Sequence, residues 1–202
     1  GALTSFLASR VGNRWKFTLG LDVAMNLIKL DETDLKSLEK DMRFDACKYE
    51  VSEDNVLSSL KSMDVSGPCP RLGVGQDQKL YIIFSPQGKA TQLVKLISNA
   101  SAYRELRIAL VKRFGEGRSK ESGDEFSKIT WELGENFLTL KRLSSGYSVL
   151  RYFSPTFIEI TKQRDKLKEK ELERKNTPYL KVDVEAITVS SENRQSIESE
   201  IL

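Results

Sequence analysis

The chain has 202 residues, of which 39% are hydrophobic and 30% charged, a balance typical of a globular protein large enough to bury a core. Its 32 basic and 29 acidic residues give a formal net charge of +3, too small to indicate a polyanionic partner without a local basic patch. Histidine is absent, which excludes histidine-based triads, histidine-ligated zinc and histidine as a general base.

The first 66 residues predict a smaller subdomain of helices and strands. Apolar residues at helical spacing predict a helix over residues 3–11, and the alternation of Trp15, Phe17 and Leu19 predicts a strand that Gly20 closes. The later elements expected here are a helix over residues 21–30, whose pattern also permits a strand, a helix over 31–42, a strand over 44–51 and a helix over 52–63.

Glycine and proline cluster in residues 64–78, which predicts the clearest loop in the chain. We expect residues 67–78 to link the subdomain to the rest of the protein. The loop contains Gly73 and Gly75, but it lacks the third glycine of a dinucleotide-binding fingerprint and the Gly-Lys-Ser/Thr end of a P-loop. It is therefore interpreted as a structural turn.

The two cysteines, Cys47 and Cys69, are candidates for a disulfide. The segment between them is long enough for a bridge to remove appreciable entropy from the unfolded chain, and Cys69 lies in a stiff Gly-Pro-Cys-Pro turn. Two buried thiols in a reducing compartment are the alternative. The cysteines are too far apart for Cys-x-x-Cys redox chemistry and too few for a zinc site.

Residues 79–153 predict the core of an α+β fold. Two strands joined by a Ser-Pro-Gln-Gly turn form a hairpin, a helix follows that ends at Gly115, residues 116–124 form a polar loop, and three strands joined by tight turns form a meander. The order β-β-α-β-β-β predicts an antiparallel sheet with helices packed on one face, and we expect this core to extend over residues 79–160.

The C-terminal part is dominated by charge. A helix is predicted over residues 156–175, and because it has few apolar residues after Thr161 we expect residues 161–176 to project from the core. Residues 177–202 are expected to be a partly disordered extension in which residues 179–189 could form a strand.

No motif of an enzyme active site is present: there is no nucleophile elbow, and no pair of carboxylates stands out as acid and base. We therefore predict no catalytic, cofactor-binding or metal-binding residues. A basic strip on the helix before Gly115 includes Arg104 and Arg107, and with Arg151 and Tyr152 of the meander it is the candidate interaction surface. Interspersed acidic residues weaken any signal for nucleic acid.

One pattern in the second half of the chain resembles a known group of proteins. It consists of the pair Phe114-Gly115, then the strand segments Trp131-Glu132-Leu133, Phe137-Leu138-Thr139-Leu140 and Val149 to Pro155, and then a Lys/Glu-rich helix. Over residues 79–176 the chain resembles small uncharacterised bacterial envelope proteins of the periplasmic or lipoprotein type. The resemblance implies an exported protein, and it implies no established activity.

These features predict a non-catalytic protein-binding domain of the bacterial cell envelope, with another envelope protein as its partner. The alternatives are an inhibitor or immunity-type protein, and an enzyme that works without histidine. No apolar run approaches the roughly 20 residues that cross a bilayer. Because the chain begins with Gly1, we expect a signal peptide or a tag to have been removed; a cytoplasmic location is the alternative.

Overall fold

The computed structural model describes residues 16–44, 46–53, 60–76, 78–98, 102–122 and 126–175. The elements expected over residues 3–11 and 179–189 lie outside the described residues. In chain order the elements are α2 (Lys16–Leu27), α3 (Leu35–Phe44), β1 (Lys48–Glu53), β2 (Lys61–Ser66), the 3-10 helix η2 (Pro70–Leu72), β3 (Lys79–Phe84), β4 (Ala90–Ile97), α4 (Ala102–Phe114), β5 (Arg118–Ser122), β6 (Phe126–Leu133), β7 (Asn136–Arg142), β8 (Ser148–Phe153) and α5 (Pro155–Arg174).

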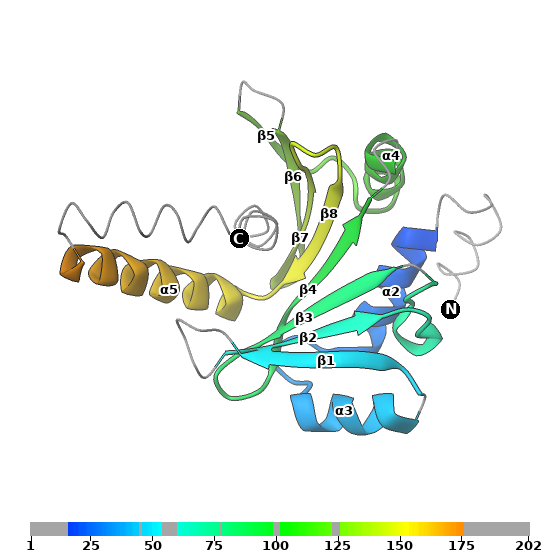
Figure 1. The fold of residues 1–202 in the computed structure, drawn as a ribbon. Coiled ribbons are helices and arrows are strands. Elements are labelled where there is room, and N and C mark those ends of the chain that lie inside the picture. The colour runs from blue at the N-terminus through cyan, green and yellow to red at the C-terminus, as the bar shows by residue number, and fades with distance from the viewer. Residues whose placement is uncertain are drawn as a thin grey trace.

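The strands form one antiparallel sheet of eight strands in the order β1-β2-β3-β4-β8-β7-β6-β5 (Figure 1). The predicted hairpin is β3 with β4, and the predicted meander is β6, β7 and β8. These two units are joined by β4 and β8, which pair along their length with Leu93 opposite Tyr152. The α+β class and the antiparallel sheet predicted from the sequence are confirmed.

The segments before and after the predicted linker share this sheet. Val51 of β1 lies opposite Met63 of β2, and Val65 of β2 lies opposite Leu80 of β3. The linker therefore connects two neighbouring strands, and the first strands of the chain contribute to the same core as the later ones.

Side chains alternate between the two faces of the sheet. We call the face that carries Ile82, Leu93 and Leu150 face A. Helices α2, α3 and α4 cover it, and their apolar residues join it in one core: Leu21, Ala24, Ile28, Leu38, Met42, Tyr103, Leu106 and Leu110. The indole Nε1 of Trp131 donates a 2.8 Å hydrogen bond to the Gly115 carbonyl oxygen, which ties the end of α4 to β6.

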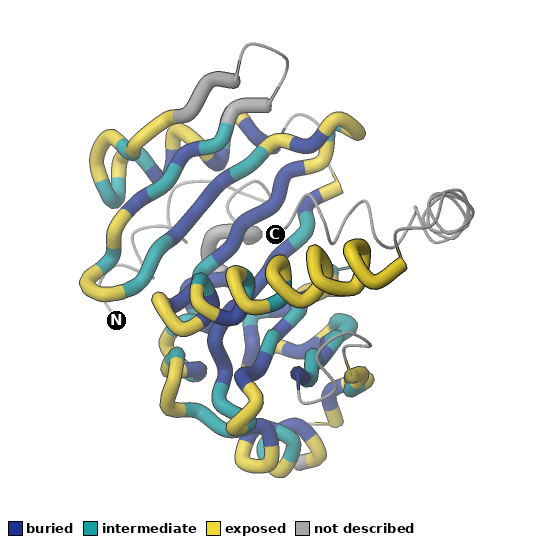
Figure 2. The backbone as a smooth tube through the Cα atoms, turned by 90° about the vertical axis from the view of Figure 1, so that its left-hand side faces the viewer, coloured by how far each residue is buried: buried dark blue, intermediate teal, exposed yellow. Residues whose placement is uncertain are grey.

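The opposite face, face B, carries Gln92, Arg151 and Phe153 and holds α5. The ring of Phe157 lies 5.9 Å from the ring of Phe153, and Phe157 and Ile160 are buried. After Ile160, the residues of α5 are exposed apart from two that are half-buried (Figure 2). Only the first turns of this helix are thus packed against the sheet.

The structure corrects the prediction for residues 14–19. Helix α2 begins at Lys16, so most of the segment expected to be a strand forms the first turn of a helix. The buried residues that follow are spaced three and four apart, and this longer pattern outweighs a short alternation of period two. They are Leu21, Ala24 and Ile28.

Two further segments form strands that the sequence did not predict. Met63 and Val65 are buried and alternate with half-buried polar residues, so the end of the helix expected over residues 52–63 is strand β2. Its start belongs to strand β1, and residues 54–59 lie outside the described residues. Part of the loop expected over residues 116–124 is strand β5, which pairs with β6 at the edge of the sheet. An edge strand needs no buried apolar side chain, so the sequence of β5 carries no hydrophobic alternation from which the strand could be predicted.

The structure joins Cys47 and Cys69 in a disulfide, with the two Cα atoms 5.2 Å apart. The bridge connects the residue before β1 to the residue before η2, and both cysteines are buried. It closes a loop with a sequence separation of 22 residues. In the loop-entropy description, a bridge of this span stabilises the fold by about 3 kcal/mol.

Removing the bridge is therefore expected to destabilise the protein. We predict that the double variant Cys47→Ala, Cys69→Ala loses about 3 kcal/mol of unfolding free energy in urea titration, and that reduction of the wild type has a comparable effect. The control is the double variant itself, whose stability a reductant should leave unchanged. Equal stability of the oxidised and reduced wild type would contradict the prediction.

Candidate functional site

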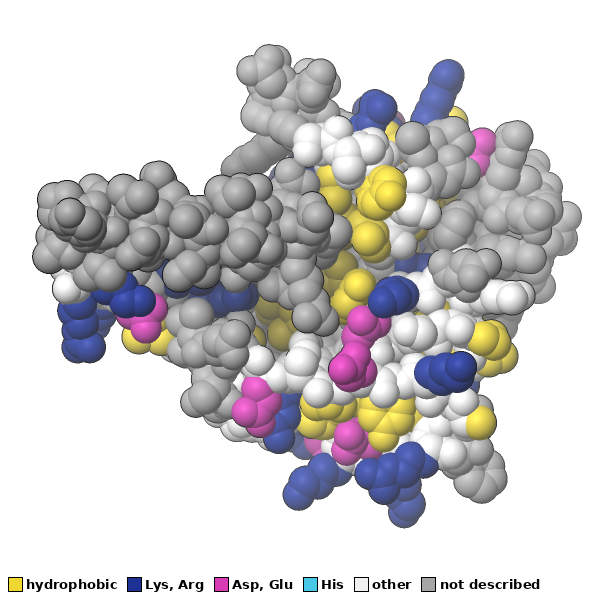
Figure 3. Space-filling model, viewed as in Figure 1, with side chains coloured by type: hydrophobic (Ala, Val, Ile, Leu, Met, Phe, Trp, Pro, Cys, Tyr) yellow, Lys and Arg dark blue, Asp and Glu magenta, His cyan; other side chains and the backbone are white. Residues whose placement is uncertain are grey.

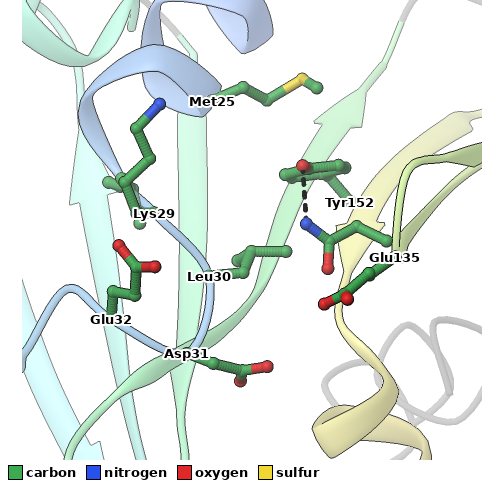
Figure 4. Close-up of a pocket in the computed structure, with 9 residues that line it drawn as sticks. Met25, Lys29, Leu30, Asp31, Glu32, Glu135 and Tyr152 are labelled. Carbon is green, nitrogen blue, oxygen red and sulfur yellow. Dashed lines mark hydrogen bonds between the residues drawn. The ribbon is translucent and has the colours of Figure 1, made fainter.

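A cavity of about 330 Å³ lies between the loop that follows α2 and the tight turn that joins β6 to β7 (Figure 4). The loop contributes Leu30 and Asp31, the turn contributes Glu135, and the strands contribute Asn136 at the start of β7 and Tyr152 of β8. Its volume is at the lower end of the range for ligand pockets. It is the candidate functional site of the described part of the chain.

The loop is held in place by backbone hydrogen bonds to the β3–β4 hairpin. The Asp31 amide donates to the Ala90 carbonyl oxygen at 2.7 Å, and the Ala90 amide donates to the Thr33 carbonyl oxygen at 2.8 Å. Asp31 has a φ of 64°, in the left-handed region that aspartate tolerates better than most residues. This wall of the cavity is thus defined by main-chain bonds to the sheet.

Asp31 also connects the cavity to α5. Its carboxylate accepts hydrogen bonds from the Ser154 hydroxyl at 2.9 Å and the Thr156 hydroxyl at 3.1 Å. Ser154 precedes α5 and Thr156 lies in its first turn. The cavity therefore lies at the base of the helix that the sequence predicted to project.

The polar groups of the cavity are mainly acceptors. The Asn136 amide nitrogen donates to the Tyr152 hydroxyl oxygen at 2.9 Å, which leaves the Asn136 amide oxygen as an acceptor. Three carboxylates and one lysine line the cavity, and Figure 4 shows the ammonium group of Lys29 pointing away from Glu135. No ion pair joins Glu135 to another residue of the described ranges.

The sequence singled out Arg104, Arg107, Arg151 and Tyr152 as one surface, and the structure separates them. Arg104 and Arg107 are exposed on α4, whereas Arg151 and Tyr152 are successive residues of β8 and lie on opposite faces of the sheet. Of the four, Tyr152 alone lines the cavity.

Arg151 is 5% exposed on face B. Its Nε and Nη2 donate to the Gln92 side-chain oxygen at 3.2 and 2.9 Å, and its guanidinium lies 4.9 Å from the centroid of Phe153 and 5.6 Å from that of Phe157. Burial lowers the pKa of Arg151 from its ordinary value to about 10, so it remains charged at neutral pH. Among the described residues no carboxylate pairs with Arg151. Its contacts with the rings of Phe153 and Phe157 help to hold α5 against the sheet.

A second buried cation, which the sequence analysis missed, is Lys95 on face A. It is 1% exposed, and its ammonium donates to the Gly73 carbonyl oxygen at 3.3 Å. Gly20 of α2 packs against this hydrogen bond. A Cβ atom at position 20 would collide with the Gly73 carbonyl oxygen and with the Lys95 ammonium. The only signal in the sequence is the position of Lys95 between Val94 and Leu96 in a strand with few other polar residues.

Burial of Lys95 predicts a pH dependence of stability. Its pKa is lowered from 10.5 to about 8, so between these values the unfolded state binds more protons than the folded state. The free energy of unfolding should therefore rise as the pH increases from about 8 to about 10.5. Lys95→Met should remove this contribution in urea titrations across that range, whereas the exposed Lys36→Met should retain it. Identical pH profiles for the wild type and Lys95→Met would rule out the assignment.

No group of three or more cysteine or acidic side chains is arranged to hold a metal ion within residues 16–44, 46–53, 60–76, 78–98, 102–122 and 126–175. In the same part of the chain, none of the helices has the length and apolar character needed to cross a bilayer.

Comparison with known proteins gives one distant likeness. Neither a protein-family model nor a curated protein matches the chain. A solved structure, an immunity protein of the Stenotrophomonas maltophilia type IV secretion system, aligns with 82% of this chain and 65% of its own length at 13% identity. The match spans less than two thirds of that protein, and at a TM-score of 0.20 it carries no argument about fold or function.

Proposed function

We propose that this protein is a non-catalytic protein-binding domain of the bacterial cell envelope, and that α5 is the element that contacts its partner. The partner in this proposal is another envelope protein that presents an acidic surface. Support comes from the exposure and charge of α5, from the disulfide, and from the lack of a catalytic motif in the sequence.

The observation that carries the proposal is the packing of α5. The helix has 20 residues, but only Phe157 and Ile160 are buried. Isolated helices are marginally stable in water, so a helix packed by its first turns alone gains stability when a partner covers the rest. Leu167 and Leu172 are 38% and 50% exposed on this part of the helix and would be covered by such a partner.

The charge of α5 indicates the kind of partner. Residues 162–175 contain seven basic and four acidic side chains. Figure 3 shows lysine and arginine side chains along this part of the molecule. A helix of net positive charge that extends from a domain attracts an acidic protein surface, and this attraction weakens as salt is added.

The disulfide supports an oxidising compartment. Bridges persist in the periplasm and outside the cell, whereas the cytoplasm keeps thiols reduced. The pair Cys47 and Cys69 therefore favours an exported protein, as does the envelope-protein resemblance of residues 79–176. In the inhibitor or immunity-type alternative, the partner would be an enzyme whose activity falls when it is bound.

The proposal is tested by reversing charge on α5. A photo-crosslinking residue at position 172 would identify the partner in a periplasmic extract, and binding to that purified partner would then be measured calorimetrically. We expect Lys166→Glu with Lys170→Glu to weaken binding by about tenfold or more, because both side chains are exposed on the proposed contact surface.

The matched control is Arg104→Glu with Arg107→Glu, which makes the same change in charge on the exposed side of α4. It should alter binding less than twofold. Equal losses for the two double variants would show that only net charge matters, and unchanged binding of the α5 variant would also overturn the proposal. Loss of an enzymatic activity of the partner on binding would identify the inhibitor alternative.

A further inference from the structure

We propose that the cavity at the base of α5 is a binding site for an arginine side chain of the partner protein. The guanidinium would be held by Glu135 and Asn136 beside the ring of Tyr152, and the aliphatic stem would lie against Met25 and Leu30. That the arginine belongs to a protein rests on the proposed function, whereas the chemistry of the cavity stands independently of it.

The acceptors define the charge of the ligand. Asp31 already accepts from the Ser154 and Thr156 hydroxyls, so Glu32 and Glu135 are the lining carboxylates left to receive a donor, and Glu135 is the one adjacent to Asn136. Asn136, the next residue in the chain, is oriented by its hydrogen bond to Tyr152, and its amide oxygen is a second acceptor that lines the cavity. A carboxylate next to a neutral acceptor suits a cation with several N–H donors better than an anion.

The walls define the shape of the ligand. Tyr152 supplies an aromatic ring on which a planar guanidinium can stack, and guanidinium groups favour such faces. Met25 and Leu30 also line the cavity, and Figure 4 shows both side chains on the same side of the cavity as the loop after α2, so apolar groups lie beside the polar ones. An arginine combines an apolar stem with a planar cationic end, and the cavity of about 330 Å³ is large enough to hold one.

The position of the cavity makes it part of the proposed interface. Asp31 lines the cavity and also accepts hydrogen bonds from Ser154, just before α5, and from Thr156 in its first turn, so the cavity adjoins the N-terminal end of α5. The combined surface is an acidic cavity followed by a basic helix. It therefore selects a partner in which an arginine lies beside an acidic patch, and buried arginines are frequent anchors of protein interfaces.

The test uses a small probe, so it needs no partner. N-acetyl-arginine amide would be titrated into the protein and followed by amide chemical shifts in NMR spectra. We expect binding on the order of 1 mM, with shifts at Leu30, Asn136 and Tyr152. N-acetyl-citrulline amide has the same shape without the charge and should bind at least about fivefold more weakly.

Variants assign the binding to the cavity. Glu135→Gln should weaken the arginine probe by roughly three- to fivefold, because it removes the charge and keeps the shape. Glu135 is exposed at a turn, so the variant should fold normally. Glu50→Gln, an equal change at an exposed position of β1, should leave the affinity unchanged.

Three outcomes would overturn the inference: equal binding of the citrulline probe, unchanged binding in Glu135→Gln, or tighter binding of spermidine, which would point to free amines. Any of these would leave the α5 proposal standing, since that proposal is tested by charge reversal and a purified partner. Conversely, loss of the α5 proposal would leave the measured affinity of the cavity unaffected.

Discussion

The pairing of β4 with β8 is the constraint on which the rest of the structure depends. It joins residues 92–97 to residues 148–153, far apart in the sequence, and thereby merges the hairpin and the meander into one sheet. The same pairing brings Ser154, at the end of β8, to the loop that holds Asp31. The start of α5, the cavity beside it and the two faces of the sheet are all placed by this contact.

The alternation along β8 divides the molecule into two different environments. Arg151 points to face B, where it is buried against Gln92 and aromatic rings, while Tyr152 points to face A and lines the cavity. A cation buried without a carboxylate is costly to fold. Arg151 retains its charge because an amide oxygen and two rings replace part of its hydration. Helix α5 is mostly polar and buries only Phe157 and Ile160, and the contact between Arg151 and the Phe157 ring adds to its attachment to the sheet.

Lys95 is a second buried cation and lies on the other face of the sheet. Its ammonium reaches the Gly73 carbonyl oxygen at the point where α2 approaches most closely, and glycine at position 20 makes that approach possible. The protein thus contains a buried cation on each face of one sheet. Both sit in strands that join the two halves of the sheet, where flanking strands leave little access to water.

The sequence by itself determined the local elements whose signals are short in range. The hairpin, the meander and α4 follow from alternation, tight turns and helical spacing, and the α+β class follows from their order. It could not predict β5, because an edge strand of polar residues is defined only by its neighbour, and it misread residues 16–19, where two periodicities compete. The candidate site was hidden for the same reason. Glu135, Asp31 and Tyr152 belong to three segments with no shared motif, and only strand pairing, which depends on contacts distant in sequence, brought them around one cavity.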